Sequence, residues 1–188
     1  MNTLHMSNRY GKVAVHQVNS IEDRILLIGQ QVDKSQQDPR IRAVAYEVVR
    51  GTSQHGNDHE DQELSQLFWF IKNNIEYRQD ARDYDTYAVA WRTLEMKAGD
   101  CDCHTILLLG LAAQLGYLTG AKVISPDGVS WHIYPIVGVR SKAAPSAIMP
   151  LDTTQPNSFP GWEPPILQRK KEIMVTFANG QSHIKHIR

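Results

Sequence analysis

Residues 105–116 form a stretch that would be apolar on nearly every side of a helix. A helix that is apolar all round is a buried one, so we expect this segment to run through the centre of the core. Cys101 stands just before it, after Gly99, whose conformational freedom would let the chain turn. The N-terminal end of a helix favours negative charge, so a thiol there is expected to have a lowered pKa. The sequence therefore predicts a nucleophilic cysteine at the start of a central helix.

A nucleophilic thiol needs a base and a group that orients the base, and both residue types follow downstream. His132 lies in the run 131–139, and Asp152 ends the run 148–152. Taken singly, each residue has an ordinary explanation, because buried cysteines, strand histidines and turn-forming aspartates are common structural residues. In the order Cys, His, Asp they predict a triad in which His132 takes the thiol proton and Asp152 orients the imidazole ring.

The segments around these three residues resemble those of the transglutaminase-like superfamily, and in particular its small single-domain members found in tailed phages and prophages. The resemblance covers about residues 38–175. It is carried by the segments Ile75-Glu76-Tyr77, Arg92 to Ala98, Gly99-Asp100-Cys101-Asp102, Trp131-His132-Ile133-Tyr134, Pro150-Leu151-Asp152-Thr153-Thr154 and Pro160 to Pro164. The chain departs from the pattern at Cys103 and His104, where the phage-type members usually carry a second acid and a lysine.

A Cys-His-Asp triad performs acyl transfer through a thioacyl intermediate. The backbone N–H of Cys101 would stabilise the oxyanion, and Tyr77 and Trp91 are candidates for a second donor. The resemblance implies a protease, amidase or transglutaminase acting on protein or peptidoglycan peptides. A second hypothesis is a non-catalytic structural protein that keeps the fold and contacts other phage structural proteins, associated with the virion.

A third hypothesis is a zinc-binding module. Cys101, Cys103 and His104, with His132 or Asp152, could supply a mixed tetrahedral set of ligands. Structural zinc sites usually pair their cysteines at wider spacing, and no second pair occurs. We therefore expect no metal and no cofactor. Cys103 is expected to point into the core or toward the rim, and His104 either to reach Cys101 or to lie exposed.

The remaining pattern places helices first and strands after them. Ser20 and Asp38 are expected helix caps, and Asp85 a candidate cap for a short helix ending at Met96. A helix after the polar loop 51–59 would bury Leu64, Leu67, Phe68, Ile71 and Ile75. Strands are expected at 121–125, 131–139 and 148–152, and a terminal hairpin over 173–187 through Asn179-Gly180. Residues 1–19 are expected to form an arm or an edge strand.

This order predicts one α+β domain over residues 1–188, with an antiparallel sheet packed on the cysteine-bearing helix. A papain-like core has this arrangement, and the resemblance implies it as well. Because side chains alternate along a strand, His132, Tyr134 and Ile136 share one face, which is expected to look onto the helix start.

Composition excludes several other classes. The chain has 188 residues, 41% of them hydrophobic, which suits a single domain with a sizeable core. Its 20 basic and 20 acidic residues give no net charge, so we expect neither nucleic acid nor an anionic membrane as a partner. No apolar stretch is long enough to span a membrane, and the start lacks the layout of a signal peptide. We expect synthesis in the cytoplasm.

Overall fold

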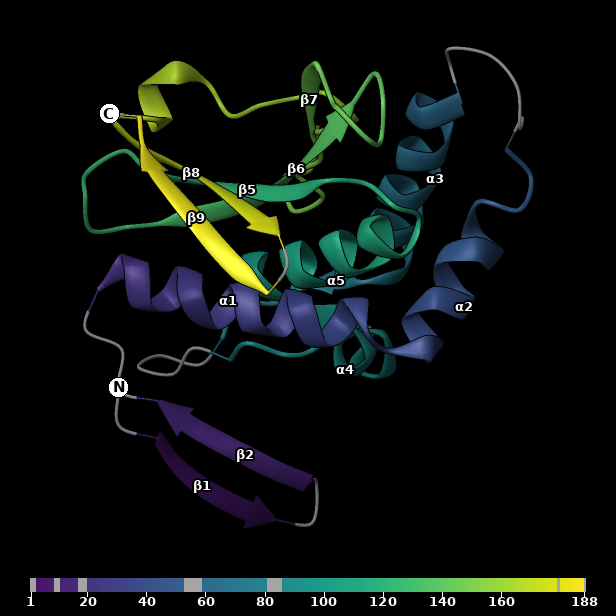
Figure 1. Cartoon of the computed structure of the whole chain (residues 1–188). Coiled ribbons are helices and arrows are strands. Elements are labelled where there is room, and N and C mark those ends of the chain that lie inside the picture. The colour runs from purple at the N-terminus through teal and green to yellow at the C-terminus, as the bar shows by residue number, and fades with distance from the viewer. Residues whose placement is uncertain are drawn as a thin grey trace.

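The computed structural model describes residues 3–8, 11–16, 20–52, 59–80, 86–178 and 180–187. A five-stranded antiparallel sheet lies against a group of helices, with helix α5 (Cys101–Gln114) between the sheet and the other helices (Figure 1). The strand order is β7-β6-β5-β8-β9. The strands are β5 (Thr119–Ser125), β6 (His132–Val139), β7 (Ala147–Pro150), β8 (Lys171–Ala178) and β9 (Gln181–His186). The expected α+β class is confirmed.

Helix α5 forms the centre of the core, as its sequence predicts. Ten of its 14 residues are buried. Gly110 lets helix α1 (Ile21–Gln36) approach closely, because a Cβ atom at this position would lie 2.9 Å from the Cβ atom of Ser35. A side chain there would force the two helices apart. The apolar surface of α5 is thus covered on all sides, which holds Cys101 at its first position in place.

Three helices from the first part of the chain pack around α5. They are α1 (Ile21–Gln36), α2 (Pro39–Val48) and α3 (His59–Asn74). The predicted caps are present: the Ser20 hydroxyl accepts from the Asp23 N–H, and the Asp38 carboxylate from the Arg40 N–H. Helix α3 buries Leu64, Leu67, Phe68 and Ile71, and Ile75 is buried just beyond its end. Most of the polar loop expected over 51–59 lies outside the described residues.

A short helix leads into the cysteine. Helix α4 (Ala90–Met96) begins at Ala90 without a side-chain cap and ends where Lys97 adopts a left-handed conformation. Asp85, the expected cap, lies outside the described residues, and the helix begins later than predicted. Strand β3 (Glu76–Tyr77) pairs in parallel with β4 (Ala98–Gly99), which brings Tyr77 beside Gly99. This pairing sets the position of the chain immediately before Cys101.

The two faces of β6 have different surroundings. Ile133 and Val137 belong to the main core with α5. The opposite face carries a second, small cluster made of Ile124, Tyr134, Ile136 and the partly buried Met174. The expectation that the Tyr134 face looks onto the helix start is therefore wrong, since the helix packs on the other face. His132 is the first residue of β6, so it lies at the end of the sheet rather than over it.

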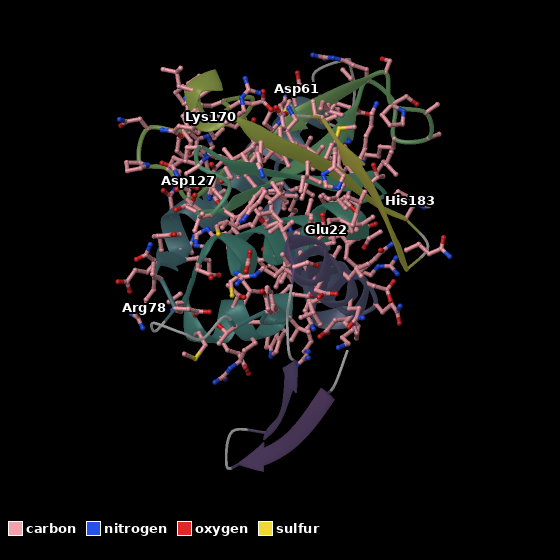
Figure 2. The ribbon with its side chains drawn as sticks, turned by 90° about the vertical axis from the view of Figure 1, so that its left-hand side faces the viewer. Glu22, Asp61, Arg78, Asp127, Lys170 and His183 are labelled. Atoms are coloured by element: carbon pink, nitrogen blue, oxygen red, sulfur yellow. The ribbon has the colours of Figure 1, made fainter. Side chains whose placement is uncertain are left out.

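The chain has a hairpin at each end. Strands β8 and β9 pair antiparallel, with Ala178 opposite Gln181, as the sequence predicts, although Asn179 itself lies outside the described residues. Strands β1 (Thr3–Asn8) and β2 (Gly11–His16) form a separate two-stranded hairpin, not an edge of the main sheet. This hairpin extends away from the main body in both views (Figures 1 and 2). Among the described residues, no helix is long and apolar enough to cross a bilayer.

Candidate active site

Cys101 is the first residue of α5, and its position depends on the two residues before it. The Asp100 carboxylate caps the helix by accepting from the Cys103 N–H at 3.1 Å. Gly99 is needed for space rather than for a turn: its φ angle is not positive, but an added Cβ atom would lie 2.5 Å from the Cβ atom of Cys103. The Gly-Asp-Cys sequence thus combines close packing, a cap and a half-buried thiol.

His132 and Asp152 form a hydrogen-bonded pair. Nε2 of His132 lies 2.8 Å from Oδ2 of Asp152, and Asp152 is fully buried. The other carboxylate oxygen, Oδ1, accepts from the backbone N–H of Thr154 at 3.0 Å and from its hydroxyl at 2.7 Å. Asp152 lies just beyond the end of β7 at Pro150, not within the strand. With Nε2 engaged, Nδ1 is the ring nitrogen that remains for proton transfer.

The Asp152 carboxylate is ionised despite its burial. Burial pushes its pKa upward, but the hydrogen bonds from His132 and Thr154 act in the opposite direction and leave the pKa below its usual value. A charged, fully buried carboxylate that faces an imidazole fixes the orientation of the ring and would stabilise an imidazolium ion. This is the role expected of Asp152.

Cys101 and His132 line the same cavity, of about 470 Å³. Its walls come from four parts of the chain: the first half of α1, the end of β3 with the segment after it, the start of α5, and β5 with the start of β6. The lining residues are Ile21, Arg24, Ile25, Ile28, Tyr77, Gln79, Asp80, Asp100, Cys101, Asp102, Val123, Trp131, His132 and Ile133. In Figure 2, Arg78 and Asp127, close in sequence to two of these walls, lie on the same side of the molecule. The fold therefore brings Cys101 and His132, the predicted nucleophile and base, to one cavity.

The thiol is surrounded by carboxylates, which changes its expected chemistry. Burial, followed by the charges of Asp102 and Asp100, raises the pKa of Cys101 well above its usual value, while the Ile133 backbone acts in the opposite direction. Oδ1 of Asp102 lies 3.9 Å from Sγ. The prediction of a lowered pKa is wrong, because burial of the thiol, together with the full negative charges nearby, outweighs the roughly half charge of a helix end. Cys101 thus carries its proton at neutral pH and needs a base to remove it.

The two oxyanion candidates lie in different places. Tyr77 lines the cavity with 44% of its surface exposed, and burial followed by the charge of Cys101 raises its pKa. Its phenol is therefore a proton donor at neutral pH. Trp91 is not among the lining residues, and its ring lies against the guanidinium group of Arg40, 4.6 Å from the ring centroid. This placement favours Tyr77. As first residue of α5, Cys101 also has a backbone N–H without an acceptor inside the helix.

Cys103 and His104 turn away from Cys101 in separate directions. Cys103 is buried, as expected, with Sγ 3.5 Å from the Thr86 carbonyl oxygen, and burial raises its pKa to about 12. His104 is buried, and its Nδ1 atom lies 2.8 Å from the Thr153 hydroxyl, so it neither reaches Cys101 nor lies exposed. Within the described ranges, no three His, Cys, Asp or Glu side chains converge as metal ligands would.

Sequence reasoning missed several contributors to the site. The Asp-Thr-Thr sequence contains the local signal for the Thr154 bonds, because an aspartate readily accepts hydrogen bonds from the residue two positions on. A histidine inside an all-round apolar helix similarly indicates burial at position 104. By contrast, no local pattern indicates that α1 forms one wall of the cavity, since only packing brings it there.

No protein-family model matches the chain, and no curated protein matches it in sequence. Solved structures do share its fold. A candidate cysteine protease from Cytophaga hutchinsonii aligns with a TM-score of 0.51 at 11% identity, over 100% of this chain and 76% of that protein. A candidate protease from Parabacteroides distasonis aligns with a TM-score of 0.54 at 12% identity, over 97% of this chain but only 39% of that protein.

A transglutaminase structure aligns with a TM-score of 0.45 at 12% identity, over 80% of this chain and 37% of that protein. At such low identities the likeness to the two proteases concerns the fold alone. The chain thus shares its α+β fold with these two proteases, and in this chain an antiparallel sheet packs on a central helix that begins with a cysteine.

Proposed function

We propose that the protein catalyses cysteine-dependent acyl transfer on amide bonds, with Cys101 as nucleophile, His132 as base and Asp152 as the group that orients the base. The observation that carries the proposal is the buried hydrogen bond between His132 and Asp152 beside a cavity that also contains Cys101. If His132 and Asp152 were ordinary core residues, there would be no reason for a fully buried carboxylate to bond an imidazole ring that lines a cavity.

The proposed reaction begins with transfer of the thiol proton to Nδ1 of His132. Sγ of Cys101 attacks the amide carbonyl, and the Cys101 N–H and the Tyr77 hydroxyl would stabilise the oxyanion. The carbon–nitrogen bond then breaks, and the imidazolium returns its proton to the leaving amine. The thioacyl group passes to water, which releases an acid, or to another amine, which forms a new amide.

The raised pKa of Cys101 makes His132 indispensable in this scheme. A thiol that is ionised at rest can attack without help, whereas a protonated thiol gains nucleophilicity only as its proton leaves. We therefore propose that proton transfer accompanies the attack on the carbonyl. The substrates we propose are proteins or peptidoglycan peptides, and the acceptor is water or an amine.

A non-catalytic structural role is the second candidate, and the same carboxylates favour it, because a persistently protonated thiol is a poor nucleophile. The finer proposal, that the chain belongs with phage or prophage proteins, is associated with virions and contacts other phage structural proteins, rests on the sequence motifs alone. It is tested separately, by looking for the chain in purified particles.

Incubation with a peptide library and with a fluorescent primary amine tests the enzymatic proposal. We expect peptide cleavage detected by mass spectrometry, or incorporation of the amine into a protein acceptor. Cys101→Ala should abolish either activity, whereas Cys103→Ala, the matched control in the same helix turn, should retain it. Full activity of Cys101→Ala would exclude the mechanism. A wild-type protein that is inert in both assays and towards thiol reagents would favour the structural role.

A further inference from the structure

Thr153, the residue after Asp152, is hydrogen-bonded to a buried histidine of α5, the helix that begins with Cys101. His104 lies one helical turn after Cys101, and only 1% of its surface is exposed. Its Nδ1 atom lies 2.8 Å from the hydroxyl oxygen of Thr153, which is itself buried. This hydrogen bond therefore joins the helix that carries Cys101 directly to the segment that carries Asp152, in a region that solvent does not reach.

A histidine at position 104 lowers the stability of the folded state, and packing alone gives no reason for a histidine there. Burial lowers the pKa of His104 to about 4, so the ring is neutral at physiological pH. Its Nε2 atom is buried and has no hydrogen-bond partner among the described residues, although the Glu76 carbonyl is close enough to raise the pKa. Burying an unpaired polar atom is unfavourable. A leucine would fill this part of the core without that cost.

The segment after Asp152 is also fastened from α3. The ammonium group of Lys72 donates to the Ser158 hydroxyl at 2.7 Å and to the Gln155 carbonyl. Lys72 thus fixes the far part of the segment, and His104 the part adjacent to Asp152. Thr153 is the only one of these attachment points that directly follows the triad aspartate in sequence.

We infer that His104 is a positioning residue: its hydrogen bond to Thr153 keeps the Asp152 carboxylate in line with Nε2 of His132. The inference rests on the proposed function, since it assigns His104 a role in the same triad. His104 is not among the residues that line the cavity, although its ring lies edge-on to that of Tyr77, which does line it, with the ring centroids 6.1 Å apart. Without the bond, the backbone at Thr153 can shift, and a small misplacement of Asp152 suffices to let the imidazole ring change tautomer.

Two variants remove this bond from opposite sides. His104→Phe replaces the ring by an apolar one, and Thr153→Val replaces the hydroxyl by a methyl group of the same shape. Thr153→Ser restores a hydroxyl and serves as the conservative rescue. Tyr117→Phe is the matched control, because it deletes a buried hydrogen bond to Glu63 beyond the opposite end of α5, about 20 Å away.

The readout is the tautomer of His132, obtained from the nitrogen chemical shifts of its ring, together with the iodoacetamide alkylation rate of Cys101. We expect the wild type, Thr153→Ser and Tyr117→Phe to show a single Nε2–H tautomer. Thr153→Val and His104→Phe should show a mixture, with Cys101 alkylation at pH 7 slowed about 10- to 100-fold.

A wild-type tautomer and alkylation rate in Thr153→Val would overturn the inference, and this variant keeps the test valid if His104→Phe fails to fold. Equal slowing of Cys101 alkylation in Tyr117→Phe would also overturn the inference, because loss of any buried hydrogen bond would then have the same effect. The tautomer is measured without substrate. If the wild type were inactive in the assays and Thr153→Val still lost the single tautomer, the proposed function would be refuted and the positioning role would not.

Discussion

The hydrogen bond between Nε2 of His132 and Oδ2 of Asp152 spans 2.8 Å and has one end fully buried. Because Thr154 holds the second oxygen of the same carboxylate, the aspartate has little freedom to turn away. The imidazole is thus oriented by a rigid group, with Nδ1 left for proton transfer.

Asp102→Asn should make Cys101 more reactive. The Asp102 carboxylate is one cause of the raised pKa of Cys101, so its removal should lower that pKa and speed iodoacetamide alkylation at pH 7 several-fold. Alkylation of wild-type Cys101 should also accelerate as pH rises above neutrality. Mass spectra that separate Cys101 from Cys103 provide the measurement, and the control is Asp33→Asn, at a half-buried carboxylate of α1 that accepts from the Gln37 side chain. A slower reaction in Asp102→Asn would contradict this account of the thiol.

Asp152→Asn should reduce acyl transfer by about four orders of magnitude, because an amide can hold the wrong imidazole tautomer. The change preserves size, so the loss should appear mainly in kcat rather than in KM. Steady-state kinetics on any peptide found to be a substrate will measure the loss, with Asp33→Asn again as control. If Asp152→Asn retained wild-type kcat, the aspartate would have no orienting role.

Stability should fall between about pH 6.5 and pH 4 because of His104. Burial lowers its pKa from 6.5 to about 4 in the folded state, so over this range the unfolded chain binds a proton that the folded chain excludes. The contribution of His104 to the free energy of unfolding is complete above pH 6.5 and decreases as the pH falls toward 4, by about 3 kcal/mol in all. Urea denaturation at pH 7 and pH 4.5 should show this loss in the wild type.

In His104→Gln, which cannot titrate, that part of the pH dependence should be absent. An equal loss of stability in the variant and the wild type would mean that other groups cause it. This outcome would also argue against a neutral, buried His104.

Gly99→Ala should destabilise the start of α5. The new methyl group would lie 2.5 Å from the Cβ atom of Cys103, so the helix must shift, at a cost of about 1–3 kcal/mol. The control is Gly51→Ala, where an added Cβ atom meets nothing within 4 Å. Urea denaturation of both variants checks this, and equal stability would show that the backbone relaxes freely. Cys101 alkylation should change in Gly99→Ala alone.

Much of the architecture could be predicted from short stretches of sequence. The all-round apolar segment identifies the buried helix α5, since no other arrangement hides such a surface. The Ser20 and Asp38 caps are contacts between near neighbours in sequence, as is the turn between β8 and β9. The start of α4 was less predictable, because it begins without a side-chain cap.

The order of Cys101, His132 and Asp152 is evident from the amino-acid sequence alone, as are the helix that starts near the cysteine and the strand that starts near the histidine. The charge state of the thiol, the face of β6 that meets α5, and the bond between His104 and Thr153 arise only when the chain is packed. The two groups of features differ in the range of the interactions that set them. Helix burial, capping and turns depend on neighbouring residues, whereas a pKa and a buried hydrogen bond depend on groups that distant segments bring into one low-dielectric region.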